Sequence, residues 1–354
     1  MGGKVNREKL EQILERLPKL TICVVGDFFL DRYFIIEPSL AEKSVETGLT
    51  AHQVVDRRLA PGAAGTVVSN LRALGVGRVV CISVIGDDGE GFELERALYR
   101  MGADVGSLIK REDRFTPCYT KPMMREMDEE RELERIDIKN RKPMESEVEK
   151  EIINRLRLVI PEANGIVIAD QVQERNVGVI TDRVRAEISA LAEEYYERPF
   201  IADSRARIGE YRNIILKPNK FEAVDAVKGR ARLDLGLLDP SAIELSEAKA
   251  CAAELSKRTG RPVFMTAQEE GIFVVDGGIT HIPAVSVSGP IDPVGAGDSC
   301  TAAIVSALCA GATLEEAALL GNIVASITIQ KLGQTGTATP QEVLNRFEEY
   351  ISAQ

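Results

Sequence analysis

The stretch Asp292-Pro-Val-Gly-Ala-Gly-Asp298 follows a segment predicted to be extended and precedes a predicted helix over Ser299–Ala310. The small residues Gly295, Ala296 and Gly297 let backbone N–H groups converge at a helix N-terminus, where unpaired donors and the helix dipole attract anions. Asp298 adds a carboxylate that can accept a proton from an attacking hydroxyl. An anion site beside a base is what phosphoryl transfer requires. The alternative is a tight turn with Asp298 as an N-terminal charge only.

Short β-branched runs alternate with amphipathic helical stretches over most of the chain. The predicted strands are Thr21–Gly26, Arg78–Ile85, Gly165–Asp170, Phe200–Asp203, Ile214–Lys217 and Val263–Thr266. The predicted helices are Ala63–Leu74, Phe92–Met101, Val148–Val159, Val177–Tyr196, Ala242–Arg258, Ser299–Ala310 and Leu314–Gln330. This alternation is typical of βαβ units, with helices on both faces of a parallel sheet. We therefore expect a three-layer α/β fold with a mostly parallel central sheet.

Two stretches, about 33–60 and 115–138, interrupt this alternation with segments of alternating polar and apolar residues. We expect them to form a small antiparallel β lid that rises from a single domain spanning 1–354. The charged run Arg125–Arg135 could also be a solvated turn or helix. At the N-terminus, Leu10, Ile13, Leu14 and Leu17 have helical spacing, which favours a surface helix over a signal peptide.

Composition excludes several classes of function. The 44 Lys and Arg against 55 Asp and Glu give a net charge of −11, which argues against a nucleic-acid partner. Apolar runs are far shorter than the roughly 20 residues of a membrane span, so we expect no membrane association. The two histidines, and six cysteines without a CxxC pair, argue against a His or thiolate metal site. Reduced, buried cysteines would fit a cytoplasmic protein.

The motif at 292–298 followed by an apolar helix resembles the C-terminal signature of the ribokinase or PfkB family of carbohydrate kinases. The resemblance covers the chain from Val24 to about Val343. Within the family, the sequence is similar in particular to the kinase half of bifunctional heptose kinase/adenylyltransferases. Val24–Tyr33 (VVGDFFLDRY) and Glu134–Ile138 (ERIDI) carry that similarity. It implies a ribokinase-like fold, Asp298 as general base, and the Gly295-Ala296-Gly297 backbone as the anion hole. We expect no nucleotidyltransferase domain, since the chain ends soon after the last helix.

The same resemblance implies a site for the acceptor substrate. Asp31 is similar to the family's substrate-binding Asp, whose two oxygens can accept two sugar hydroxyls. The segment 61–66 (PGAAGT) resembles the family's GGxxN signature, in which Gly62 lets the backbone approach the sugar. Ala63 replaces the usual second Gly, and Thr66 replaces the Asn that contacts substrate. These departures leave the identity of the substrate open, and the segment could also simply begin a helix.

A nucleotide site is implied further along the chain. Asn219 and Glu222 resemble the N-x-x-E element that organises Mg²⁺ and its waters near the ATP phosphates, although the same spacing is a helix capping box. Thr266 and Gly271 resemble the ends of a T-x-G-x-x-G nucleotide-binding turn, with Gln268 at the middle Gly. Asn322 matches the adenine-pocket position; without the family it is a polar residue within a helix.

A monovalent cation such as K⁺ often lies beside the family's anion hole. Asp292, Val294 and the loop 331–337 would hold it in this chain.

We therefore expect an ATP- and Mg²⁺-dependent kinase that phosphorylates a hydroxyl of a sugar or sugar phosphate. The alternatives are a nucleoside kinase of the same fold, or a sugar- or nucleotide-binding regulator without turnover. Cationic residues in or near the lid could bind a phosphate on the sugar or could be surface charges: Arg32, Lys43, Arg57, Arg58 and Arg125. Because a small sheet standing off the body cannot bury both of its faces, we also expect a homodimer through the lid.

Overall fold

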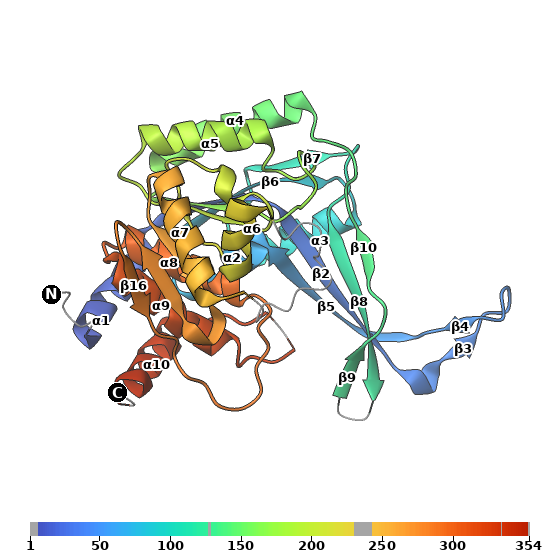
Figure 1. Ribbon diagram of the computed structural model, residues 1–354. Coiled ribbons are helices and arrows are strands. Elements are labelled where there is room, and N and C mark those ends of the chain that lie inside the picture. Colours follow the sequence, from blue (N-terminus) through green and yellow to red (C-terminus); the bar gives the residue numbers. More distant parts are fainter. Residues whose placement is uncertain (1–5, 127–128, 230–242, 334, 353–354) are drawn as a thin grey trace.

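A nine-stranded sheet forms the centre of the computed structural model, which describes residues 6–126, 129–229, 243–333 and 335–352 (Figure 1). The strands in spatial order are β16 (Ile279–Ile282), β15 (Ile272–Val275), β14 (Val263–Thr266), β13 (Ile215–Leu216), β12 (Phe200–Ser204), β11 (Gly165–Asp170), β1 (Thr21–Gly26), β6 (Arg78–Gly86) and β7 (Leu108–Arg111). All pairs from β14 to β7 are parallel, and the pairs β14–β15 and β15–β16 are antiparallel, so β15 alone runs against the other described strands of this sheet. The mostly parallel sheet expected from the sequence is confirmed.

Helices cover both faces of this sheet and enclose two apolar cores. On one face lie α1 (Arg7–Arg16), α2 (Ala64–Ala73), α3 (Gly89–Arg100), α8 (Ala296–Cys309), α9 (Leu314–Thr328) and α10 (Pro340–Ser352). On the other lie α4 (Ser146–Val159), α5 (Asp182–Glu194), α6 (Lys220–Lys228) and α7 (Leu245–Thr259). Strand β1 serves both cores, since Ile22 and Val24 join the first and Cys23 and Val25 the second. A strand that is buried on both faces has a continuous apolar sequence. The sheet therefore lies between two layers of helices, which gives a three-layer fold.

Capping residues set the helix starts, and one of them corrects a predicted boundary. The sequence predicts a helix from Val177, but α5 begins at Asp182 because the Thr181 side chain accepts the Val184 N–H and caps the helix there. The residues before Thr181 form a loop instead. The N-terminal helix is confirmed, with Leu10, Ile13 and Leu14 buried. The expected helix from Ala242 begins at Leu245, and Ala242 lies outside the described residues.

A second, smaller sheet forms the lid. It contains β10 (Ile136–Ile138), β8 (Cys118–Glu126), β2 (Phe28–Ile36) and β5 (Val54–Ala63) in that order, with β9 (Glu129–Glu132) paired to β8. Most pairs are antiparallel, while the pair β2–β8 is parallel. The lid strands start at Phe28 and end at Ala63, beyond the expected 33–60, because β2 and β5 are continuous from the body into the lid. Residues 127–128 of the expected 115–138 segment lie outside the described residues.

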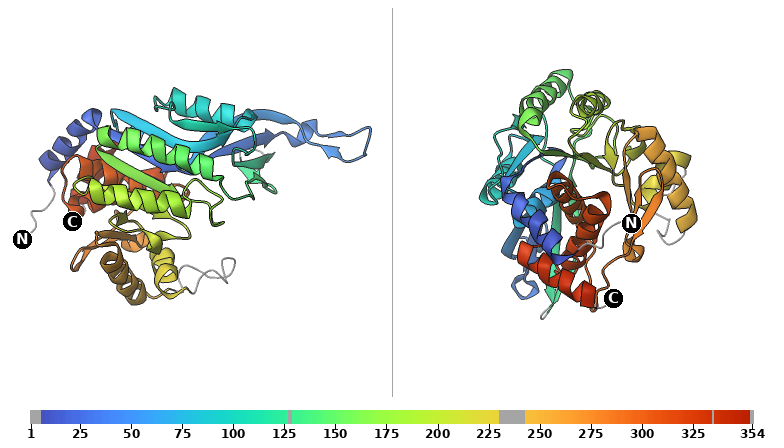
Figure 2. Two further views of the ribbon diagram at one scale, coloured as in Figure 1. Left: turned by 90° about the horizontal axis from the view of Figure 1, so that it is seen from above. Right: turned by 90° about the vertical axis from the view of Figure 1, so that its left-hand side faces the viewer.

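A narrow arm continues from the lid. The short strands β3 (Glu42–Lys43) and β4 (Thr50–Ala51) pair near its end. Figure 1 and the left view of Figure 2 show the arm reaching away from the body. Among the described helices, none has the length and apolar character needed to cross a bilayer.

The junction between β5 and α2 generates a stability prediction. Ala63 has φ 53° and ψ −118°, a positive-φ conformation that glycine adopts without strain and alanine does not. Ala63→Gly should therefore raise the free energy of unfolding by about 0.5–1 kcal/mol, measured by urea denaturation. Ala73→Gly, at the end of the same helix, is the control and should lower it by about 0.5–1 kcal/mol. A loss of stability in Ala63→Gly would contradict the assigned conformation.

Candidate active site

A cavity of about 490 Å³ lies where the lid meets the carboxyl ends of the parallel strands. Asp31, Tyr119 and Lys121 line it from the lid strands, while Gly295 and Asp298 line it from the start of α8. In open α/β sheets, ligands bind outside the carboxyl ends of the strands, so the position of the cavity fits a binding site. Six residues expected at the site line this one cavity: Asp31, Ala63, Thr66, Val294, Gly295 and Asp298.

The turn before α8 has the geometry of an anion site. Gly295 caps the helix with φ 80° and ψ 0°, a conformation that strongly favours glycine. The Ala296 N–H donates to the Pro293 carbonyl at 3.1 Å, so this one of the three expected amides is engaged inside the turn. The N–H groups of Gly297 and Asp298 follow in the first helical turn, where backbone donors have no acceptor within the helix. These two amides of the predicted anion site therefore lie in the first turn of α8.

A buried ion pair lies directly beside that turn. Lys217, just after β13, is 2.9 Å from Asp203 on β12, and both side chains are almost fully buried. The Thr301 hydroxyl of α8 donates to the same Asp203 oxygen at 3.1 Å. The Lys217 ammonium lies 3.6 Å from the position that a Cβ on Gly297 would take. A positive charge is therefore fixed next to the candidate anion site.

The electrostatic surroundings change the acidity of Asp298. Burial, followed by the nearby negative charge of Asp203, raises its pKa to about 7, while Lys217 and Arg205 act in the opposite direction. A carboxylate with a pKa near neutrality is a stronger base than an exposed aspartate. Asp298 therefore has the acidity expected of a general base at the wall of the cavity.

The candidate acceptor residues come from β2, β5 and α2. Asp31 of β2 pairs with Ala60 of β5, and its carboxylate lies against Gly62 so closely that no side chain would fit there. The Lys121 ammonium is 3.3 Å from Asp31 and also donates to the Tyr33 hydroxyl at 3.1 Å. Thr66, in α2, is buried. The carboxylate of Asp31 thus opens onto the cavity with a cationic partner.

The candidate nucleotide residues form a neighbouring group. Asn219 and Glu222 form a capping box at the start of α6, with both hydrogen bonds at 2.8 Å. A backbone bridge joins Asn219 to Thr266 at the end of β14. Burial and Asp203 raise the pKa of Glu222 to about 7, which places that carboxylate in the same electrostatic environment as Asp298. Both interpretations of Asn219, as a helix cap and as a site residue, are compatible with this geometry.

Gly271 and Asn322 contact one segment from different elements. The Asn322 amide in α9 donates to the Ile282 and Pro283 carbonyls at 2.9 Å each. The Gly271 backbone lies against the same segment, with no room for a side chain between it and Ala284. Asn322 therefore holds the chain that borders Gly271.

The expected cation position has a lysine close by. Asp292 Oδ1 accepts the Val294 N–H at 3.1 Å, which closes a small turn. In the loop expected to supply carbonyl ligands, the Lys331 ammonium binds the Thr337 carbonyl at 2.6 Å and Glu342 at 2.7 Å. Gln334 of this loop lies outside the described residues.

Comparison with known proteins gives the family. Residues 20–342 match the model of the pfkB family carbohydrate kinases. The chain belongs to this family. It is 30% identical over 343 residues to the "Bifunctional protein HldE" of Trichlorobacter lovleyi and 32% identical over 347 residues to that of Citrifermentans bemidjiense. Each alignment covers 96% of this chain but only 65% and 66% of the relative, so the chain spans about two thirds of their length.

Solved structures show the same fold for this pfkB family member. Arabidopsis thaliana ribokinase, complexed with ribose and ATP, aligns with a TM-score of 0.66 at 17% identity, covering 93% of this chain and 99% of that one. Phosphofructokinase-2 from Escherichia coli, in complex with substrates and products, aligns with a TM-score of 0.65 at 16% identity, covering 94% and 100%. The three-layer ribokinase-like fold expected from the sequence is confirmed.

Several charged residues of this pfkB kinase fold were not predicted as site residues. Asp27, Asp203 and Lys217 come directly after β1, near the end of β12 and after β13, at the same edge of the sheet. Their positions at the ends of predicted strands could have indicated a role at the site, because parallel strands bring their carboxyl ends together. The cations expected near the lid do not line the cavity; Arg32 pairs with Glu90 and Arg58 with Glu130.

The ion pair beside the turn generates a prediction. Lys217→Met leaves Asp203 buried without a counter-charge, so the free energy of unfolding should fall by about 3 kcal/mol, measured by urea denaturation. Arg78→Met, which removes a largely exposed partner of Asp104, is the control and should lower it by less than about 1 kcal/mol. Equal effects of the two substitutions would show that the Lys217 pair is not buried in solution.

Proposed function

We propose that the protein transfers the γ-phosphoryl group of ATP to a hydroxyl of a sugar phosphate, with Asp298 as general base. The observation that carries the proposal is that Asp298 and the first turn of α8 share one cavity with Asp31 of the lid. A base, an anion site and a hydroxyl-binding carboxylate thus line a single space.

Each residue group has a defined part in this reaction. The Asp31 carboxylate accepts hydrogen bonds from acceptor hydroxyls and orients the one to be phosphorylated. Asp298 takes the proton of that hydroxyl as its oxygen bonds to the γ-phosphorus and the bond from phosphorus to the ADP oxygen breaks. The N–H groups of Gly297 and Asp298, with the Lys217 ammonium close by, stabilise the negative charge on the transferring group.

The charges on the cavity wall favour an acceptor that is already phosphorylated. Five cationic side chains line it, against the four carboxylates of Asp27, Asp31, Glu174 and Asp298. The five are Arg114, Lys121, Arg135, Lys139 and Arg205. The wall thus carries one more cationic than anionic side chain, in a chain with a net charge of −11. Arginine and lysine at such a wall suit a phosphate monoester.

ATP would lie beside the turn at Thr266–Gly271. Asn322 binds the Ile282 and Pro283 carbonyls of the neighbouring segment and so would fix one side of this nucleotide site. The capping-box carboxylate of Glu222 and the amide of Asn219 are hard oxygen ligands of the kind Mg²⁺ prefers, and they would hold it through its waters. When bound, the ion would neutralise phosphate charge. A K⁺ ion beside Asp292 and the Val294 carbonyl belongs to the same proposal. So does a cytoplasmic location, where ATP is available and the six free cysteines stay reduced.

ATP consumption with a panel of sugars, sugar phosphates and nucleosides tests the proposal. We expect turnover with at least one sugar phosphate and a lower kcat/KM for the matching unphosphorylated sugar. A nucleoside kinase would prefer nucleosides, and binding without any turnover would indicate a regulator.

Asp298→Asn tests the role of the base. It should keep the fold and ATP binding while lowering kcat by about 10²–10⁴-fold, because a general base is lost. In the wild type, protonation of Asp298 below about pH 7 should lower kcat/KM about tenfold per pH unit, and the variant should lack this acid limb. Asp104→Asn, far from the cavity, should retain it. Near-normal turnover in Asp298→Asn would rule out this assignment.

We also propose that two copies pair through their lids. Large apolar side chains are exposed on the lid and arm: Leu40, Val45, Leu49, Val54, Val55 and Ile136. Ile136 and Val54 border a hollow of about 760 Å³ on the lid, whose wall also includes Phe34 and Leu133. Symmetric pairing of two such surfaces would remove apolar area from water on both copies.

Light scattering measures the assembly directly. We expect a mass near twice that of the 38.7 kDa chain at micromolar concentration. Ile136→Asp, which puts a charge on the apolar face, should shift the mass toward one chain. Tyr99→Asp, at an exposed aromatic residue of α3 outside the lid, is the matched control and should leave the dimer intact. A wild-type mass near 38.7 kDa, with and without substrate, would contradict the proposal.

A further inference from the structure

The loop between β11 and α5 forms one side of the cavity. It has no helix or strand of its own, yet residues 171–174 and 177–179 line the cavity directly. A loop of this kind must have its backbone groups satisfied by other parts of the protein. We call residues 171–181 the wall loop.

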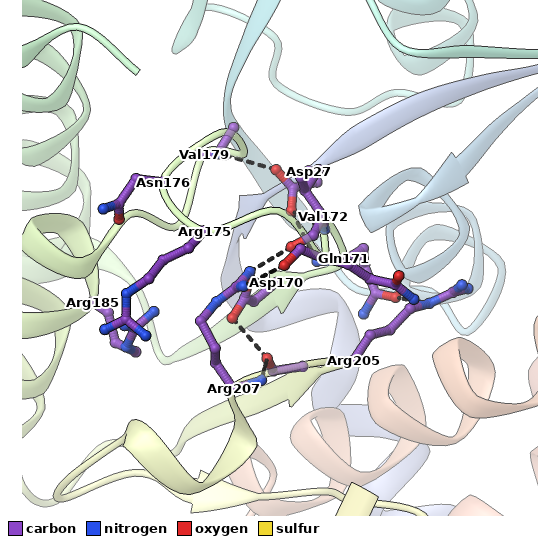
Figure 3. A network of polar contacts seen from close by, with 12 residues as sticks. Asp27, Asp170, Gln171, Val172, Arg175, Asn176, Val179, Arg185, Arg205 and Arg207 are labelled. Atoms are coloured by element: carbon purple, nitrogen blue, oxygen red, sulfur yellow. Dashed lines mark hydrogen bonds and ion pairs between the residues drawn. The ribbon is translucent and has the colours of Figure 1, made fainter. Parts of the chain in front are cut away.

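A single carboxylate binds the wall loop at both ends. Asp27, buried after β1, accepts the N–H groups of Gln171 at 2.8 Å and Val172 at 3.0 Å on one oxygen. Its other oxygen accepts the Val179 N–H at 2.7 Å, as Figure 3 shows. Gly178 passes so near that a Cβ there would lie 2.7 Å from Asp27 Oδ1. Asp27 therefore joins the first and last parts of the loop that line the cavity.

Arginines bind the carbonyl groups of the same loop. Arg207 donates to the Val172 carbonyl and, at 2.8 Å, to the Gln173 carbonyl, and it is held by buried Asp170 at 2.8 Å. Arg114 donates to the Val177 carbonyl at 2.6 Å. Charged groups thus satisfy both the donors and the acceptors of the loop from inside the protein.

The outer side of the loop is held by exposed contacts. Arg175 pairs with Asp182 at 2.8 Å and with Glu210 at 3.0 Å, and the Asn176 amide also contacts Asp182. Exposed pairs contribute little because water screens them. The inner contacts therefore dominate the placement of the loop.

We propose that Asp27 is a positioning residue: its ionised carboxylate holds the wall loop in place and thereby sets the affinity for the acceptor. The inference rests on the proposed function, because the loop is taken to border the acceptor site. Asp27 contacts the loop and does not take part in the transfer itself.

Protonation of Asp27 would weaken this hold. Burial and the charge of Asp170 raise its pKa to about 6, while its three N–H donors act in the opposite direction. The other charged groups that face it are Arg114 and Arg207, and both favour the ionised form. In the ionised form, Oδ1 of Asp27 accepts the Val179 N–H. A proton on Oδ1 would face that N–H as a second donor, so the hydrogen bond would be lost. Loop placement should therefore loosen as the pH falls through about 6.

Hydrogen exchange of the free protein tests the placement without any substrate. Protection factors in a peptide covering the wall loop, corrected for intrinsic exchange rates, should fall at least tenfold in Asp27→Asn at pH 8. Asp182→Asn, which contacts the same loop from outside, is the matched control and should change them less than threefold. Wild-type protection should also fall between pH 8 and pH 5, which tests the idea even if Asp27→Asn does not fold. Unchanged wild-type protection over this range would overturn the proposal.

Kinetics then test the consequence for the acceptor, using the sugar phosphate of highest turnover in the panel. Asp27→Asn and Gly178→Ala, which displaces the carboxylate from the loop side, should each raise its KM at least tenfold. The KM for ATP and kcat should change less than threefold. Equal increases in both KM values, or a fall in kcat alone, would overturn the positioning role. If the panel gives no turnover, the proposed function fails, whereas the exchange result still decides whether Asp27 holds the loop.

Discussion

The ion pair between Asp203 and Lys217 joins the ends of two neighbouring strands beneath the first turn of α8. The carboxylates of Asp203, Glu222 and Asp298 lie within electrostatic reach of one another, with Lys217 as the buried cation among them. Lys217 and Arg205 do not offset burial and the negative charge of Asp203, so Asp298 and Glu222 hold their protons more tightly. The elevated pKa values of Asp298 and Glu222 follow from this imbalance together with burial.

The start of α8 and the buried charges of Asp203 and Lys217 lie together because both are at the carboxyl ends of the parallel strands. Parallel strands place all their carboxyl ends on one side, and the connections to the helices begin there. The backbone donors at the start of α8 face the space that the strand ends border. An anion bound there would be surrounded by fixed N–H dipoles and the Lys217 ammonium.

Two departures from the family's glycine pattern keep the backbone conformation that glycine favours. Ala63 has φ 53° at the start of α2, and Gln268 has φ 52° in the turn after β14. Both side chains are accommodated at a conformational cost, while the chain path of each turn remains. The shape of the candidate acceptor and nucleotide sites therefore depends on surrounding packing as well as on residue type. Asp31 and Gly62 lie on β2 and β5, two paired strands that continue from the body into the lid.

The sequence by itself determined the parts of this protein that depend on local physics. Short β-branched runs identified β1, β11 and β14 to the residue, and small residues before an apolar helix predicted an anion site at 295–298, where the structure has the start of α8. The short helix α6 and the four-residue strands β7, β15 and β16 were not predicted, since short segments carry little periodicity. Only the tertiary structure decided that Asp27 binds Val179, 152 positions away, and that Lys217 lies beside Gly297. Such contacts depend on strand order and on which buried charges find partners, and no pattern within one stretch of sequence contains that information.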